Sequence, residues 1–122
     1  MSVLTNYAGN AMISAVIETG TTYYVALFQA DPTALGSFAN EVAGGSYARQ
    51  PSTFSAPSGK TTGNSVVLIY TNMPACTVRY IGICKTLTGT TNDLLTYGQV
   101  TDIVVADGKS LSMEVNDVTL TL

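Results

Sequence analysis

The chain has 122 residues, enough for one domain with a single hydrophobic core, and only 11% of them are charged. Its net charge is −3, and the five basic residues are scattered, which argues against binding to nucleic acid. No window of about eighteen apolar residues is present, and no basic region is followed by an apolar core, so we expect neither a transmembrane helix nor a secretory signal.

The first predicted element is a helix over about residues 6–18. The side chain of Thr5 or Asn6 can cap its start by accepting a backbone N–H, and Gly20 supplies a stop. Apolar residues at roughly helical spacing, with Ile13 among them, give the helix one apolar face. This face packs on the chain's own sheet in the simpler interpretation, and docks on another subunit in the alternative.

After the helix the chain alternates strand-like runs with turns. Residues 21–28, TTYYVALF, are rich in β-branched and aromatic residues and predict a strand. A long loop over about residues 31–46 follows, and loops of this length are often functional or interface elements. It ends at Gly44-Gly45, where we expect positive φ or a close backbone approach. In the next strand, SYARQPSTFS, Pro51 predicts an edge or bulged strand.

The second half contains further strand-like runs. SAPSGKTTGN is expected to turn the chain, TLTGTTND to form a hairpin turn, and Asp107-Gly108 to form a two-residue hairpin. The predicted strands are SVVLIYTN, ACTVRYIGIC, LLTYGQVT, DIVVADG, KSLSMEVN and DVTLTL. Strands at intervals of about ten residues indicate a mainly β protein. We therefore expect one domain over residues 1–122, an antiparallel, jelly-roll-like β-sandwich with one N-terminal α-helix.

The run ACTVRYIGIC is expected to alternate, with Cys76, Val78, Tyr80, Gly82 and Cys84 on one face. A single strand would separate the two cysteines by about 26 Å. Because a disulfide needs Cα atoms within about 7 Å, we expect free thiols, as in a protein made in a reducing cytoplasm.

The residue content excludes most catalytic chemistry. Without histidine, the chain can form neither Ser-His-Asp nor Cys-His arrangements, and it lacks the commonest zinc ligand. It has no glycine-rich phosphate-binding motif and no calcium-binding spacing of aspartates. Four carboxylates, Asp102, Asp107, Glu114 and Asp117, leave a glycan hydrolase as a remote alternative, but each falls at or near a turn. We expect no enzyme, and no catalytic, cofactor-binding or metal-binding residues.

Five residues are candidates for an interface with other subunits. Arg49 and Arg79 lie on strand-like runs of a chain with few charges, where each is either an ordinary solvated residue or part of an intersubunit ion pair. The other candidates are Tyr47 beside Arg49, Phe38 in the long loop and Ile13 on the helix.

The order of several motifs resembles a known family. They are Asn6-Tyr7-Ala8 at the helix start, YVALF before Asp31-Pro32, Gly44-Gly45-x-Tyr47-x-Arg49, Phe54, Asn64, Thr77-Val78-x-x-Ile81-Gly82-Ile83 and Leu94-Leu95-x-Tyr97-Gly98. Together they span nearly the whole chain and resemble small bacteriophage virion proteins, often labelled tail fibre proteins. The chain departs from the family pattern at Cys84-Lys85 and lacks a Trp before Thr77.

The resemblance implies a structural protein of the virion, made in the cytoplasm of the bacterial host, without cofactors. Within the virion, the short chain without a repetitive shaft favours a capsid decoration or cement protein that stabilises the major capsid protein shell. The alternative is a tail fibre or tail-tip module that contacts the host surface. The expected partners are the major capsid protein or other virion proteins, and further copies of the chain in a homotrimer or other homo-oligomer.

Overall fold

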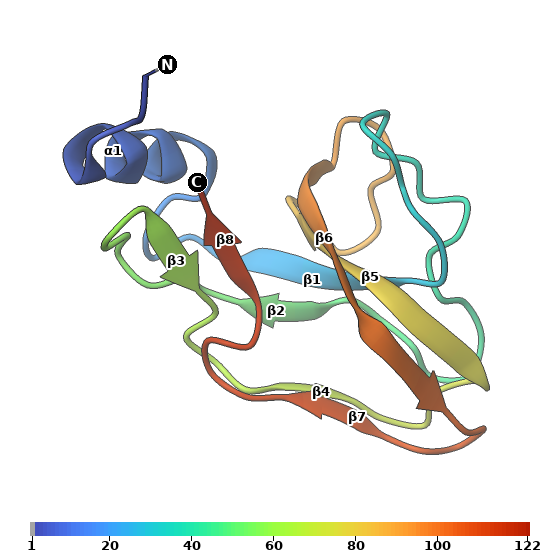
Figure 1. The fold of residues 1–122 in the computed structure, drawn as a ribbon. Helices are drawn as coiled ribbons and strands as arrows, with labels where there is room; N and C mark the ends of the chain where they lie inside the picture. The colour runs from blue at the N-terminus through green and yellow to red at the C-terminus, as the bar shows by residue number, and fades with distance from the viewer. Residues whose placement is uncertain (1) are drawn as a thin grey trace.

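The computed structural model describes residues 2–122, which form one helix and eight strands (Figure 1). The elements in chain order are α1 (Asn6–Val16), β1 (Tyr23–Phe28), β2 (Gln50–Ser52), β3 (Thr61–Gly63), β4 (Leu68–Tyr70), β5 (Cys76–Cys84), β6 (Leu94–Val105), β7 (Leu111–Met113) and β8 (Thr119–Thr121). The predicted class, mainly β with one N-terminal helix, is confirmed.

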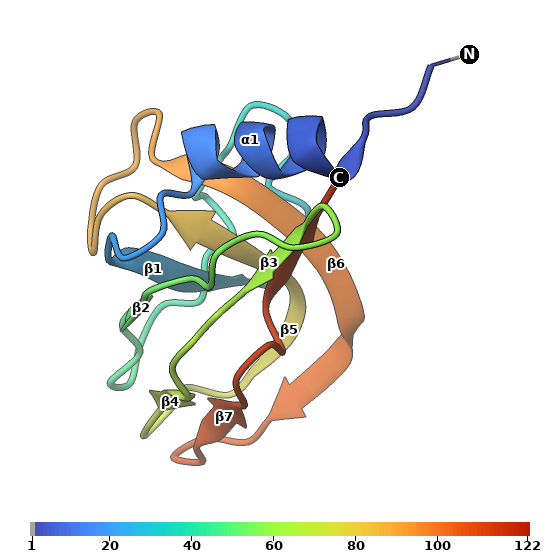
Figure 2. The same cartoon turned by 90° about the vertical axis from the view of Figure 1, so that its left-hand side faces the viewer.

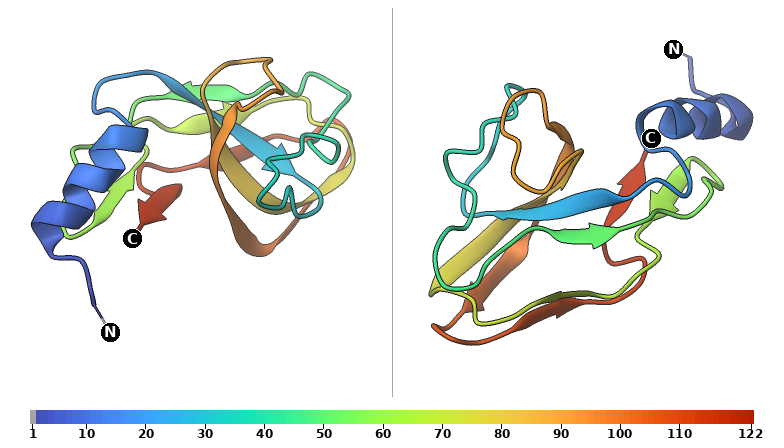
Figure 3. Two further views of the ribbon diagram at one scale, coloured as in Figure 1. Left: turned by 90° about the horizontal axis from the view of Figure 1, so that it is seen from above. Right: turned by 180° about the vertical axis from the view of Figure 1, so that it is seen from behind.

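All strand pairs are antiparallel, and they form two layers. One layer is a four-stranded sheet in the order β2-β1-β5-β6. The other consists of two short ladders, β3-β8 and β4-β7. In the view from behind, the β4-β7 ladder runs along the bottom of the picture, and the β3-β8 ladder lies near the helix (Figure 3). The arrangement is sandwich-like.

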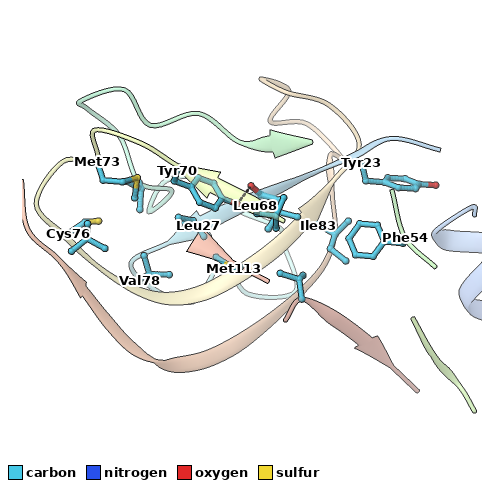
Figure 4. Packing of buried hydrophobic residues seen from close by; sticks show 14 of the residues in the cluster. Tyr23, Leu27, Phe54, Leu68, Tyr70, Met73, Cys76, Val78, Ile83 and Met113 are labelled. Carbon is cyan, nitrogen blue, oxygen red and sulfur yellow. Dashed lines mark hydrogen bonds between the residues drawn. The ribbon is translucent and has the colours of Figure 1, made fainter. Parts of the chain in front are cut away.

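The main hydrophobic core lies between these layers (Figure 4). Leu27 and Val78 contribute to it from the sheet, and Leu68 and Met113 from the opposite ladder. The hydroxyl of the buried Tyr70 donates a hydrogen bond of 2.8 Å to the backbone oxygen of Val25, which links β4 to the sheet. A smaller cluster around Ala26, Phe28 and Cys84 covers the other face, so β1 is buried on both sides.

The two ladders are separated at a buried asparagine. The Asn64 side chain donates to the backbone oxygens of Val66 and Glu114 and accepts from the backbone N–H of Val118. These bonds satisfy backbone groups where regular pairing stops, which an apolar side chain could not do.

The predicted alternation along β5 is wrong beyond Val78. Val78 pairs with Ile103, but Tyr80 pairs with Gln99, so the ladder contains a β-bulge where residues 100–102 of β6 lie opposite Arg79; a second register shift lies between Ile83 and Cys84. Before the bulge Val78 contributes to the main core, and after it Ile81 packs against the same core. A bulge inserts residues into the ladder and thereby reverses which side chains face each layer.

The helix start is as predicted, because the Thr5 side chain accepts a hydrogen bond of 3.2 Å from the backbone N–H of Ala8. The helix ends at Val16, two residues before the predicted end, and lies beside β3 and β8 at one end of the sandwich (Figures 1 and 3). No helix within residues 2–122 has both the length and the apolar character needed to cross a membrane.

Several strand boundaries differ from prediction. LLTYGQVT and DIVV form one continuous strand, β6, and the expected turn region SAPSGKTTGN contains β3. Asp107-Gly108 does form a turn, in which Lys109 donates its backbone N–H to the oxygen of Ala106. The strands on either side of this turn pair with different partners, β5 and β4, so the predicted hairpin is wrong.

Two other local predictions are confirmed. Cys76 and Cys84 are both buried free thiols at opposite ends of the single strand β5. Gly44 and Gly45 both have positive φ, of 108° and 54°. A Cβ at Gly45 would also lie 2.5 Å from the backbone oxygen of Asn72.

Candidate functional site

The segment between β1 and β2 folds back onto the sheet. Gln29 donates its backbone N–H to the oxygen of Asn40 at 2.9 Å, and Val42 donates to Leu27 at the same distance. This pairing places Glu41 opposite Phe28 in an isolated β-bridge. The long loop is therefore held against β1, and its one central carboxylate is brought toward the chain interior.

A buried ion cluster forms around Arg49, which is only 4% exposed. Two of its nitrogens, Nε and Nη2, donate to the two carboxylate oxygens of Glu41 at 2.8 and 3.0 Å. Nη1 donates to Asp93 at 3.2 Å and to the backbone oxygen of Thr86 at 2.9 Å. The guanidinium also lies 4.4 Å from the centre of the Phe38 ring, a cation–π contact.

Asp93 is fixed from its other side by the turn that joins β5 to β6. Thr86 donates to it from the backbone N–H at 3.2 Å and from the hydroxyl at 2.9 Å. Lys85 donates its backbone N–H to the backbone oxygen of Asp93. Arg49 thus connects two loops that are more than 30 residues apart in the sequence. One is the long loop that contains Glu41, and the other is the β5-β6 turn that contains Thr86 and Asp93.

Tyr47 completes the cluster. Its hydroxyl donates to Glu41 at 2.8 Å and accepts from the backbone N–H of Leu27 at 3.0 Å. Burial raises the pKa of Tyr47 well above its usual value, and the nearby Glu41 carboxylate raises it further, so the phenol is neutral. Its ring stacks on Tyr70 at 6.1 Å between centres, which joins the cluster to the main core.

The charges in the cluster suit a structural role. Burial would lower the pKa of Arg49, but hydrogen bonding and Coulombic attraction from Glu41 outweigh it, so the pKa is raised and the guanidinium is charged. Burial also raises the pKa of the Cys84 thiol to about 12, which keeps it protonated and poorly nucleophilic. Glu41 and Asp93 both pair with Arg49, and the arrangement fastens loops rather than presenting a reactive group.

The structure brings together three of the five predicted interface residues. Tyr47, Arg49 and Phe38 meet in the ion cluster, inside one chain. Ile13 is 1% exposed and packs within its own chain, and Gly9 is the other buried residue of the helix. Arg79 alone remains at the surface, where it forms a 3.5 Å ion pair with Asp102 across the β-bulge.

The carboxylates of the remote hydrolase alternative do not form a group. Asp102 lies on β6 in the four-stranded sheet and pairs with Arg79. Glu114 and Asp117 lie in the other layer, in the turn between β7 and β8, where Asp117 accepts the Glu114 backbone N–H at 2.8 Å. Within residues 2–122, no cluster of three or more cysteine and carboxylate side chains could hold a metal ion.

A surface groove of about 330 Å³ lies between β6 and β8. It is lined by residues 96–100 of β6 and 117–121 in and beside β8, with Ile81 and Ile83 also in its lining. An apolar cavity of about 180 Å³ adjoins it, bounded by α1, Leu95 and Leu122, and the two share Thr96 and Leu120. This groove is the candidate assembly surface.

Sequence reasoning missed Glu41 and Asp93 as partners of Arg49. Glu41 is the one acid near the centre of the long loop, and Asp93 ends the run TLTGTTND, whose residue types indicate only a turn. The available signal was the small number of charged residues, because a buried carboxylate needs a cation beside it and the chain has few of either. The groove and its Gly98 were not predicted.

The family model described as Podophage GP4 fiber I protein gp80 matches residues 3–121. No curated protein matches the chain.

Proposed function

The chain belongs to the family of the podophage GP4 fiber I protein gp80 and is a bacteriophage virion structural protein; within the virion, we propose that it is a tail fibre module. The observation that carries this proposal is the extent of the family match, which spans residues 3–121. The family is named for a fibre protein, which favours the tail over the head.

The surface supports an assembly role. Few residues are charged, so electrostatic repulsion between copies is weak. Large apolar side chains are exposed beside the groove, including Met12 at 52%, Val16 at 46% and Leu122 at 49%. Such groups in a virion protein are suited to burial against neighbours. The proposed partners are further copies of the chain, as a homotrimer or another homo-oligomer, and other virion proteins.

Labelling of intact virions tests the location. A short affinity tag inserted after Leu35, which is 93% exposed, should leave the sandwich unchanged and bind gold-labelled antibody. Electron microscopy should then show gold at the tail. A second tag after the exposed Thr90, in the other loop, controls for masking of one site by neighbours.

Gold spread over the head with both tags would contradict the fibre proposal. That outcome would support the other prediction from the sequence, a capsid decoration protein bound to the major capsid protein. The two locations also differ in copy number, since a decoration protein covers the whole shell and a fibre module is present in few copies.

A further inference from the structure

Two unpaired strand edges face each other across the groove between β6 and β8. β6 is the last strand of the four-stranded sheet, and within the described residues 2–122 β8 pairs only with β3. Both present backbone N–H and C=O groups to the groove that no other strand takes up. Such an edge is a template for pairing with another chain.

The middle of the β6 edge lacks charge and proline, and register shifts against β5 flank it at residue 95 and at residues 100–102. Residues 94–100, LLTYGQV, contain no charge and no proline. By contrast β2, at the opposite edge of the same sheet, contains Pro51, which cannot donate a hydrogen bond. Proteins normally protect a free edge with proline or charge, so an unprotected edge indicates a partner.

At Gly98, in the middle of this edge, neither the packing nor the backbone conformation of its own chain requires a glycine. A Cβ at Gly98 would have no atom within 4 Å, and its φ is not positive. The glycine of β5 differs, because a Cβ at Gly82 would lie 2.5 Å from a side-chain carbon of Leu94. A strand glycine without an internal reason marks a place where another backbone approaches closely.

The chain also offers a segment that fits such a groove. Residues 2–5 precede the helix and lead away from the body of the molecule (Figure 2). Thr5 is extended, with φ −69° and ψ 162°, and the side chains of Val3 and Leu4 are 83% and 42% exposed. Among residues 2–122 this short segment pairs with no strand, and the backbone oxygen of Leu4 accepts a hydrogen bond of 3.1 Å from Lys60 Nζ.

We propose that the groove between β6 and β8 receives residues 2–5 of a second copy of this chain, added as a strand along β6. Backbone hydrogen bonds to the free edge would supply affinity, and Gly98 gives the incoming backbone room. Because side chains alternate along a strand, Val3 and Leu4 would point to opposite sides, one of them toward Ile81 and Ile83. This inference rests on the proposed assembly role but not on the location in the virion.

Two variants of the full chain each remove one half of the contact. Gly98→Lys places a charged side chain in the groove and should not disturb the monomer, because the site is open. The double variant Val3→Asp and Leu4→Asp removes the apolar segment, and the new acids precede a helix N-terminus, where negative charge is tolerated. Val104→Lys, on β6 but outside the groove and 79% exposed, is the matched control.

Sedimentation velocity and light scattering report the outcome, with far-UV circular dichroism to show that each variant is folded. We expect the wild type and Val104→Lys to self-associate, and Gly98→Lys and the double variant each to be monomeric. Mixing the two monomeric variants should give a 1:1 dimer, because one retains the segment and the other retains the groove.

Three results would overturn the inference. They are a wild type that is monomeric at all concentrations tested, a Gly98→Lys variant that associates like the wild type, and a mixture that stays monomeric. None of these results bears on the gold-labelling experiment, so failure of the groove and failure of the fibre location are distinguishable.

Discussion

Replacing Arg49 with methionine is the most informative perturbation of the ion cluster. Arg49→Met keeps much of the side-chain volume but removes four hydrogen bonds and the only cation beside Glu41 and Asp93. Removing one partner of a buried ion pair leaves an uncompensated charge and costs about 3 to 5 kcal/mol. This is a large part of the roughly 5 to 15 kcal/mol by which a typical domain is stable against unfolding.

Remaining hydrogen bonds reduce the cost of losing Arg49. After the change Asp93 keeps two donors from Thr86, and Glu41 keeps the hydroxyl of Tyr47, so neither carboxylate is wholly without partners. The expected fall in melting temperature is roughly 10 to 20 °C. Chemical and thermal unfolding followed by circular dichroism measure the free energy of unfolding and the melting temperature.

Arg79→Met is the matched control, because it removes an arginine from an ion pair whose side chains are 48% and 57% exposed. An exposed pair contributes at most about 1 kcal/mol. A double-mutant cycle of Arg49→Met with Glu41→Gln separates the pair from general disturbance, and we expect the double variant to lose less than the sum. Equal losses for Arg49→Met and Arg79→Met would refute the reasoning.

Three other predictions concern the helix, a turn and alkaline pH. Ile13→Asp should unfold the protein, at a cost of about 4 kcal/mol or more, whereas Met12→Asp at the exposed neighbouring position should leave a melting curve like that of the wild type. Gly45→Ala should destabilise more than Gly59→Ala in urea titrations, because both have positive φ but only the first would also clash. Folding raises the pKa of Cys84 from 9.0 to about 12, so the contribution of the protonated thiol to stability is complete below pH 9 and is lost as the pH rises toward 12. Urea unfolding between pH 8 and 11 should show this fall in the free energy of unfolding. Cys84→Ala should make the free energy of unfolding depend less steeply on pH.

The sequence indicated those features that depend on neighbouring residues. The cap at Thr5, the edge strand at Pro51 and the positive φ at Gly44-Gly45 each follow from local stereochemistry, and each is confirmed. The helix follows from apolar spacing over about ten residues, and the existence of β5, though not its alternation beyond Val78, follows from its β-branched and aromatic residues. These features needed no knowledge of the distant parts of the chain.

Features that depend on distant contacts were not predictable from the same patterns. The turn at Asp107-Gly108 is encoded locally, but which strands pair on either side of it is decided by the two layers. Likewise, a basic residue before Pro51 indicates nothing about Asp93, which is 44 residues away. Arg49 was expected to be solvated or to face another subunit, and only the folded chain reveals its internal partners.

The β-bulge at Arg79 has a consequence for misfolded alternatives rather than for native stability. Its two charged side chains, Arg79 and Asp102, lie at one of the two places where the β5-β6 ladder changes register. If β5 slid by one residue against the sheet, its side chains would exchange faces, and Arg79 would turn toward the apolar interior without a partner. An ion pair that adds little stability to the folded state can therefore still favour the correct strand register, because a misaligned β5 would bury Arg79 without a partner.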